Sequence, residues 1–353
     1  MFNKVKPLVG LDIGSSTIKL VQMNETKRGY SLEKFGIMPL DPELIVDGTV
    51  MDAGRVTDAI RHLVAEQNSK VRDVALAVSG HSVIVKKIQV PIMSEDELEE
   101  SIKWEAEQYI PFDINDVNID FQILGNHEGA ESRDQMSVVL VAVKKDKLNE
   151  YTALITEAGL TPAVVDVDAF TLENMYSINY DIREGEVTAL VNIGASVMNI
   201  NIVKNGQYAF TRDISIGGNR YTETVQKELS LSFEEAEKAK KGEKAEGVNP
   251  EALNAVIETV NGEVASEILR SFDYFKTTSL QEKVDKIIFS GGCAKIRGLL
   301  PFLSERLGVK VEMANPFNHV EINPKLFDMQ YIRDTAPLAA VGVGLAIRRI
   351  GDR

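Results

Sequence analysis

Two short turns hold the residues of this chain that are best suited to chemistry on phosphate groups. They are Asp12, Gly14, Ser15, Ser16 and Thr17 in the first turn and Asn192, Gly194, Ala195 and Ser196 in the second. A bend of glycine and serine between two strands exposes consecutive backbone N–H groups and hydroxyls, and such concavities hold phosphate oxygens. Two such bends that face each other across a cleft can clamp the β- and γ-phosphates of a nucleotide from both sides.

The two turns belong to an internal repeat with a spacing of about 180 residues, because residues 11–20 align with residues 191–200 without a gap. Each copy has an apolar strand, a turn and a second alternating strand. We expect these strands at 8–13 and 17–23 in the first copy and at 187–193 and 197–203 in the second. The repeat indicates two homologous halves.

Two further glycine turns lie in the second half. Gly217 and Gly218 precede a predicted helix, and Ser290, Gly291 and Gly292 follow a predicted strand at 286–290. Glycine has no Cβ, so the nucleoside of a bound nucleotide can lie close to the backbone at the Ser290–Gly292 turn. The two repeat turns and this third turn, in this order, indicate one nucleotide site built from both halves.

The elements that must position these turns alternate between strands and helices. We expect a helix at 54–67 and a buried strand at 74–78. Residues 82–160 have the order β-α-β-β-α, in which Ser94 and Glu97 form a capping box at the start of the helix. A long helix from Pro250 to about Ser279 carries one apolar stripe. This alternation predicts a mixed α/β fold.

We expect four subdomains. They are a first core of residues 1–81 and 161–186, an inserted subdomain of residues 82–160, a second core of residues 187–218 and 281–353, and a helical subdomain of residues 219–280 over the nucleotide.

Composition narrows the class of protein. The chain has 353 residues, 44% of them apolar, and a formal charge of -14. This charge argues against nucleic acid as a partner and favours a basic peptide. A single cysteine, Cys293, excludes an internal disulfide framework and fits a reducing cytosol. We see no secretory signal and no stretch apolar and long enough to cross a bilayer, so we expect only indirect contact with a membrane.

The glycine turns resemble those of the actin, sugar-kinase and heat-shock-chaperone ATPase superfamily across nearly the whole chain. This resemblance implies an α/β fold of two ribonuclease H-like halves around a cleft for ATP and Mg²⁺. The position of the 82–160 insert is similar to that in the cell-division protein FtsA. Within that branch, residues 102–112 and 116–124 resemble the PilM family of type IV pilus assembly proteins.

The resemblance implies roles for individual residues. Asp12 would bind Mg²⁺ through water, because Mg²⁺ keeps much of its hydration shell. Asp168 would orient the attacking water, unless it only caps the helix that follows it. Glu237 and Lys240 would hold the adenosine, unless they form an ordinary solvated helix face. Beside Asp12 and Asp168, the nucleotide-binding candidates are Gly14, Ser15, Ser16, Thr17, Lys19, Asn192, Gly194, Ala195, Ser196, Gly217, Gly218, Glu237, Lys240, Gly291, Gly292 and Lys295.

The resemblance also implies a function. It is that of an ATP-binding cytoplasmic adaptor for pilus assembly and twitching motility, which binds the N-terminal segment of PilN in a groove between the first half and the insert. Further pilus platform and motor proteins, self-association and a location at the inner membrane through partners are implied as well. Two alternatives stay open, a filament-forming cytoskeletal ATPase like FtsA and a small-molecule kinase, although no sugar-binding signature is present. Sedimentation with ATP separates filaments from small oligomers.

Two side chains outside the cleft have simpler interpretations. We expect Cys293 to be a small packed residue and not a reactive thiol. Trp104 is expected to fill the core of the insert, with a role in lining a partner groove as the alternative.

One departure from the superfamily pattern concerns hydrolysis. Asn192 stands where many members of the superfamily have aspartate, which removes a negative charge near the metal and one proton acceptor. We therefore predict that ATP is bound but hydrolysed slowly or not at all. A purified sample that turns over ATP at a typical kinase rate of roughly 1 to 100 per second would contradict this prediction.

Overall fold

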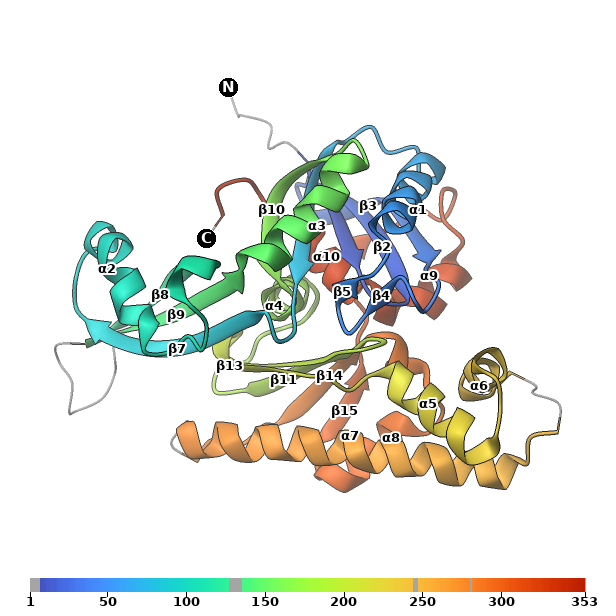
Figure 1. Cartoon of the computed structure of the whole chain (residues 1–353). Helices are drawn as coiled ribbons and strands as arrows, with labels where there is room; N and C mark the ends of the chain where they lie inside the picture. The colour runs from blue at the N-terminus through green and yellow to red at the C-terminus, as the bar shows by residue number, and fades with distance from the viewer. Residues whose placement is uncertain (1–6, 127–134, 244–246, 280, 353) are drawn as a thin grey trace.

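The computed structural model describes residues 7–126, 135–243, 247–279 and 281–352. Its core is two sheets of the same design with two helices between them (Figure 1). The first sheet has the strand order β10-β6-β1-β2-β3-β16 and the second has the order β13-β12-β11-β14-β15. In both, an antiparallel meander of three strands continues into two parallel strands, so the predicted repeat of two halves is confirmed.

The first sheet is built from strands that lie far apart in the sequence. They are β1 (Val9–Ile13), β2 (Thr17–Thr26), β3 (Gly29–Pro39), β6 (Asp73–Val78), β10 (Thr161–Val167) and the short β16 (Val320–Glu321). Helices α1 (Ala53–Glu66) and α3 (Lys145–Glu157) cover one face with a shared apolar core, near the small hairpin of β4 (Ile45–Val46) and β5 (Thr49–Val50). Asp52 caps the predicted helix α1, whose buried residues Val56, Ile60, Leu63 and Val64 form one apolar stripe.

The second sheet is covered on its outer face by helices. Its strands are β11 (Val187–Ile193), β12 (Met198–Lys204), β13 (Gln207–Ile214), β14 (Lys286–Ser290) and β15 (Lys310–Met313). The helices are α5 (Gly218–Leu229), α6 (Phe233–Lys240), α7 (Pro250–Thr278) and α8 (Leu299–Leu307), with a 3-10 turn η2 (Gly292–Lys295). The long helix α7 runs along the bottom of Figure 1 and buries Val260, Val264, Ile268 and Phe275 of its predicted stripe.

The insert projects to the left in Figure 1 and has a sheet of its own. Its elements are β7 (Val83–Pro91), α2 (Glu95–Glu107), the 3-10 turn η1 (Ile114–Asp116), β8 (Val117–Asn126) and β9 (Gln135–Lys144). The sheet order is β7-β9-β8, and α2 packs Leu98, Ile102 and Ala106 on it. Ser94 and Glu97 form the predicted capping box.

Two segments pack with the first half although we expected them elsewhere. Helix α3 was assigned to the insert, but its Tyr151, Leu154 and Ile155 lie in the core under α1. The segment after β15 was assigned to the second core. Its first residue, Ala314, does bond to Phe289 of that core, but β16 pairs with β3 and the helix α10 (Ala340–Ala346) packs with β1 and β2. All seven residues of α10 are buried, so this helix needs apolar surroundings on every side and finds them between the sheets. We therefore propose an insert of residues 82–144.

The interior between the two sheets is filled by α4 (Asp168–Asn179) and α10, with α9 (Met329–Thr335) and the 3-10 turn η3 (Ala336–Ala339) leading into the latter. The two helices cross so closely that a Cβ on Gly344 would lie 1.8 Å from the carbonyl oxygen of Thr171. Within the described residues, no helix has the length and apolar content to cross a bilayer.

The crossing of α4 and α10 predicts the effect of two glycine substitutions. Gly344→Ala should lower the free energy of unfolding by about 2 to 3 kcal/mol, because the added methyl group overpacks the crossing. In the control Gly262→Ala, in α7, the added methyl group has no described atom within 4 Å outside its own helix turn. This substitution should raise the free energy of unfolding by about 0.5 to 1 kcal/mol, because alanine favours a helix more than glycine does. Urea unfolding measures both, and equal effects of the two substitutions would contradict the role of Gly344.

Candidate functional site

The two glycine turns have the same internal hydrogen bond. The N–H of Gly14 donates to the carbonyl of Thr17 at 3.1 Å, and the N–H of Gly194 donates to that of Val197 at 3.0 Å. These glycine amides therefore close the turns. The amides that follow, of Ser15 and Ser16 in the first turn and of Ala195 and Ser196 in the second, have no acceptor among the described residues. They are the donors left for an anion.

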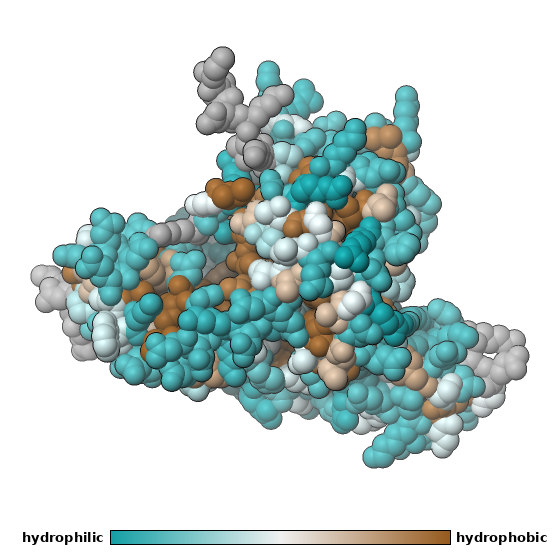
Figure 2. Space-filling view, turned by 45° about the horizontal axis from the view of Figure 1, so that its top comes forward, coloured by the Kyte–Doolittle hydropathy of each residue, from teal (hydrophilic) through white to brown (hydrophobic). Residues whose placement is uncertain are grey.

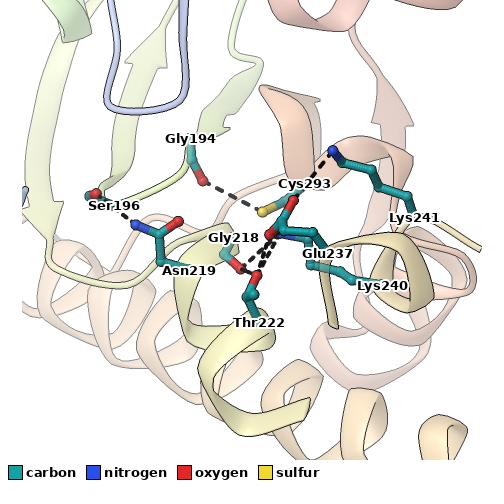
Figure 3. A network of polar contacts seen from close by, with 9 residues as sticks. All are labelled: Gly194, Ser196, Gly218, Asn219, Thr222, Glu237, Lys240, Lys241 and Cys293. Carbon is teal, nitrogen blue, oxygen red and sulfur yellow. Dashed lines mark hydrogen bonds and ion pairs between the residues drawn. The ribbon is translucent and has the colours of Figure 1, made fainter. Parts of the chain in front are cut away.

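The second turn rests on the start of α5. The N–H of Gly218 donates to the carbonyl of Gly194 at 2.9 Å, and the N–H of Asn219 to that of Ala195 at 2.8 Å. The side-chain amide of Asn219 reaches the hydroxyl of Ser196 at 3.3 Å (Figure 3). A Cβ on Gly217 would lie 2.5 Å from the carbonyl oxygen of Ala195, so only glycine allows this approach.

The third turn lies against the same hairpin. Gly291 has φ of 88°, and a Cβ there would lie 2.3 Å from the carbonyl oxygen of Ile193. Its N–H donates to the carbonyl of Pro337 at 2.8 Å. Gly292 and Lys295 follow on the exposed side of the turn, and no hydrogen bond or ion pair joins Lys295 to the other candidate residues in the described part of the chain. The glycine turns of the second half thus meet, with Lys295 at their margin.

Glu237 and Lys240 form an ion pair on α6 that bridges to α5 beside Gly218 (Figure 3). The Lys240 ammonium also donates to the hydroxyl of Thr222 at 2.8 Å and to the carbonyl of Gly218 at 3.2 Å. Burial raises the pKa of Glu237, but the hydrogen bonds from Lys240 and Thr222 outweigh burial, so the pKa is lowered overall. With 11% and 20% of their side chains exposed, Lys240 and Glu237 are not an ordinary solvated face.

Two carboxylates from the first half, Asp12 and Asp168, interact electrostatically. Asp12 at the end of β1 pairs with Lys19 of β2 at 3.1 Å. Asp168 is the first residue of α4, and its side chain does not cap that helix. Burial and the negative charge of Asp12 raise the pKa of Asp168 to about 7, against a hydrogen bond from Ser79. A carboxyl with this pKa can accept or release a proton near neutral pH.

A chain of polar contacts connects the second turn with the first half. The side-chain amide of Asn192 donates to the side-chain oxygen of Asn199 at 3.1 Å. The side-chain amide of Asn199 in turn donates to one carboxylate oxygen of Asp213 at 2.9 Å. The other oxygen of Asp213 accepts from the N–H of Gly80 at 2.6 Å. Burial raises the pKa of Asp213. The hydroxyl of Ser290 donates to the side-chain oxygen of Asn192 at 3.1 Å.

Sequence reasoning missed Ser79, Asn199 and Asp213 as parts of this site. A signal for one of them was present, because Asn199 and Asn201 interrupt the otherwise apolar strand β12. Both are fully buried, and a buried amide needs hydrogen-bond partners.

A groove of about 130 Å³ lies where the insert meets both halves. It is lined by Val83, Ile84, Val85, Lys86, Val167, Ala169, Thr211, Arg212 and Asp213. β7 and β13, which supply most of this lining, are both edge strands. Figure 2 shows apolar residues in the recess between the insert, at the left, and the rest of the molecule. Asp213 belongs both to this groove and to the polar chain that ends at Asn192.

No group of three metal-ligating side chains is present among the described residues. Asp12 and Asp168 are nevertheless compatible with Mg²⁺, which takes one or two carboxylates and fills its remaining positions with water and substrate phosphates.

The two predictions for side chains outside the cleft have different outcomes. Cys293 is buried and its thiol lies 3.6 Å from the carbonyl of Gly194, so the prediction of a small packed residue is confirmed. Burial raises the pKa of this thiol to about 12. Trp104 does not fill the core of the insert, since 78% of its surface is exposed. That prediction was wrong because Leu98, Ile102 and Ala106 already form the buried face of α2.

A family model described as type IV pilus assembly protein PilM matches residues 10–350. The chain belongs to the PilM family. A solved structure of a PilM–PilN type IV pilus biogenesis complex contains a PilM-family chain similar to this one, with 29% identity, 99% of this chain and 100% of that chain covered, and a TM-score of 0.87.

More distant relatives share the fold of the PilM family. The cell division protein FtsA of Bacillus subtilis is 23% identical over 96% of this chain and 82% of its own length. Structures of MreB5 of Spiroplasma citri bound to ADP and to AMPPNP are 13% identical to this chain, with TM-scores of 0.53 and 0.51. The match to the ADP complex covers 97% of this chain and 95% of the MreB5 chain. The chain thus has the actin-like α/β fold that its turns predicted.

The raised pKa of Asp168 predicts a pH-dependent effect of its removal. Its carboxyl ionises less readily in the folded chain than in the unfolded chain. The free energy of unfolding therefore falls as pH rises from about 4, where the unfolded state ionises, through about 7, where the folded state ionises as well. Asp168→Asn should therefore stabilise the protein by up to a few kcal/mol at about pH 8 and by much less at about pH 4. Urea unfolding at both pH values measures this, and an equal gain at each would contradict it.

Proposed function

We propose that this PilM-family chain is an ATP-binding adaptor of the inner-membrane platform for type IV pilus assembly and that it binds the N-terminal cytoplasmic segment of PilN. One observation carries the proposal, namely the similarity over 99% of the chain to PilM solved with PilN. The groove between the insert and the two halves supports it. The proposed location is the cytoplasmic face of the inner membrane, reached through protein partners.

The nucleotide is assigned to the cleft between the paired turns. The amides and hydroxyls of the first turn and those of Ala195 and Ser196 would bind the phosphates, with Lys19 as an added cation. Gly217, Gly218 and the Gly291–Gly292 turn would leave room for the nucleoside, which Glu237 and Lys240 would hold. Asp12 would hold Mg²⁺ through water, and Mg²⁺ would supply charge neutralisation to the phosphates.

Hydrolysis in this cleft is proposed to be slow. Asp168 can accept a proton near neutral pH because its pKa is about 7. Asn192, in contrast, carries no charge, and both ends of its amide are occupied by Asn199 and Ser290. The second turn thus contributes no carboxylate beside the phosphates, which suits retention of ATP better than rapid turnover.

The PilN segment is assigned to the groove lined by β7 and β13. Because each is an edge strand, an extended peptide can pair with its free backbone groups while its side chains enter the apolar lining. Asp213 lines this groove and connects through Asn199 to Asn192 of the phosphate turn. A shift of the second turn on nucleotide binding would therefore reach the groove, which makes the adaptor nucleotide-gated.

Neighbouring lysines on α6 provide a matched test of the nucleotide site. Lys240→Gln should weaken the binding of ATP–Mg²⁺ by about tenfold or more, because it removes a charged partner of the nucleoside. Lys241→Gln should have little effect, since 60% of that side chain is exposed at the outer side of Glu237. Titration calorimetry measures both affinities. Equal affinities of the two variants would remove Lys240 from the site.

A charge placed in the groove tests the peptide site. Val85→Glu should weaken binding of a PilN N-terminal peptide by about tenfold or more, because a carboxylate would be desolvated in an apolar lining. Val46→Glu, at a residue of β4 that is 45% exposed, is the control and should bind normally. Fluorescence anisotropy of the labelled peptide, with and without ATP–Mg²⁺, gives the affinities. Unchanged binding by Val85→Glu refutes the groove, and identical affinities with and without nucleotide refute gating.

A further inference from the structure

The outer face of α2 carries an exposed tryptophan that lies outside the apolar core formed by the described residues of the insert. Trp104 is 78% exposed, whereas Leu98, Ile102 and Ala106 on the opposite face are buried. Tryptophan is usually well buried and is enriched among the residues that dominate binding energy at interfaces. Its indole therefore offers a large apolar and aromatic contact to a partner.

The same helix concentrates the negative charge of the chain. Residues 95–107 contain seven carboxylates and one lysine, a net charge of -6, whereas the whole chain carries -14. Glu100 lies one turn before Trp104 and Glu107 one turn after it, and both are exposed. No ion pair joins either of them to a basic side chain in the described part of the chain.

We propose that this face of α2, centred on Trp104, Glu100 and Glu107, docks a Lys/Arg-rich segment of an inner-membrane protein, next to that protein's membrane span. An arginine guanidinium can stack on the indole of Trp104 and donate to Glu100 or Glu107 at the same time. This combination of an aromatic face and adjacent carboxylates selects a basic partner by its chemistry. The inference rests on the proposed function only in placing the partner at the membrane.

Charge decides which occupant fits. Cytoplasmic flanks of membrane spans are rich in lysine and arginine, so they complement a helix of charge -6. Anionic lipid headgroups and nucleic acid are repelled by it.

The docking face is separate from the peptide groove. The groove is lined by the first residues of β7, Val83 to Lys86, and β7 then runs to Pro91 before α2 begins at Glu95 (Figure 1). An extended strand of this length covers about 30 Å. A partner can therefore occupy the groove with one segment and α2 with another, and two linked contacts strengthen binding without any new contact at either site.

Trp104 provides a direct readout, because it is the one tryptophan in the sequence. The probe is a short synthetic peptide of arginine, lysine, leucine and serine, and its counterpart has glutamate at every basic position. Titration of the full chain with the basic probe should shift Trp104 emission to the blue and reduce quenching by acrylamide. The acidic counterpart should change neither.

Two double charge reversals test whether α2 is the site. Glu100→Lys with Glu107→Lys should weaken binding of the labelled basic probe by about tenfold or more. Glu251→Lys with Glu258→Lys, on exposed positions of α7, changes the net charge equally and should leave it within about twofold. Trp104→Ala should weaken binding like the α2 reversal, and circular dichroism confirms that each variant is folded.

Several outcomes would overturn the inference. An equal loss in both reversals would mean attraction by net charge alone, and an unchanged Trp104 emission at saturation would place the probe elsewhere. A blue shift with phosphatidylglycerol vesicles but not with the probe would identify lipid as the occupant, and a dimer in sedimentation with Trp104 already protected would identify a second copy of the chain. Val85→Glu should keep binding the basic probe while losing the PilN peptide. Failure of the unsubstituted chain to bind the PilN peptide, with the basic probe still bound, would refute the proposed function and not this inference.

Discussion

The crossing of α4 and α10 between the two sheets is the packing contact on which the cleft depends. Because Gly344 of α10 has no side chain, the backbone of Thr171 in α4 can occupy the space that a Cβ would otherwise fill. α4 begins at Asp168, and the segment that enters α10 contains Pro337, whose carbonyl accepts from Gly291. One buried crossing thus fixes a carboxylate from the first half and a glycine turn from the second at the base of the same cleft.

Local features were predictable from the sequence because their causes are local. The repeat turns, the capping box of Ser94 and Glu97 and the apolar stripe of α7 follow from residue type at short spacing, and the structure contains each of them. The assignments of α3 and of the C-terminal residues failed for a common reason. Their apolar faces could be recognised, but the surface that each one covers is formed mainly by elements remote in the sequence.

The same limit applies to the site. The turn residues could be proposed because glycine and serine at a bend between strands expose backbone N–H groups, whereas Asn199 and Asp213 contribute only through contacts across strands and across the two halves. Trp104 illustrates the opposite error. A general preference of tryptophan for the interior was applied to a helix whose buried face was already complete.

The polar chain through Asn199 also restricts how position 192 could evolve. Both oxygens of Asp213 accept hydrogen bonds, which orients the amide of Asn199 with its carbonyl toward residue 192. That carbonyl needs a donor, and an aspartate at 192 would present a lone pair to it. An aspartate at 192, as found in many members of the superfamily, is therefore disfavoured here unless Asp213 or Asn199 changes as well, so this position is coupled to residues of two neighbouring strands.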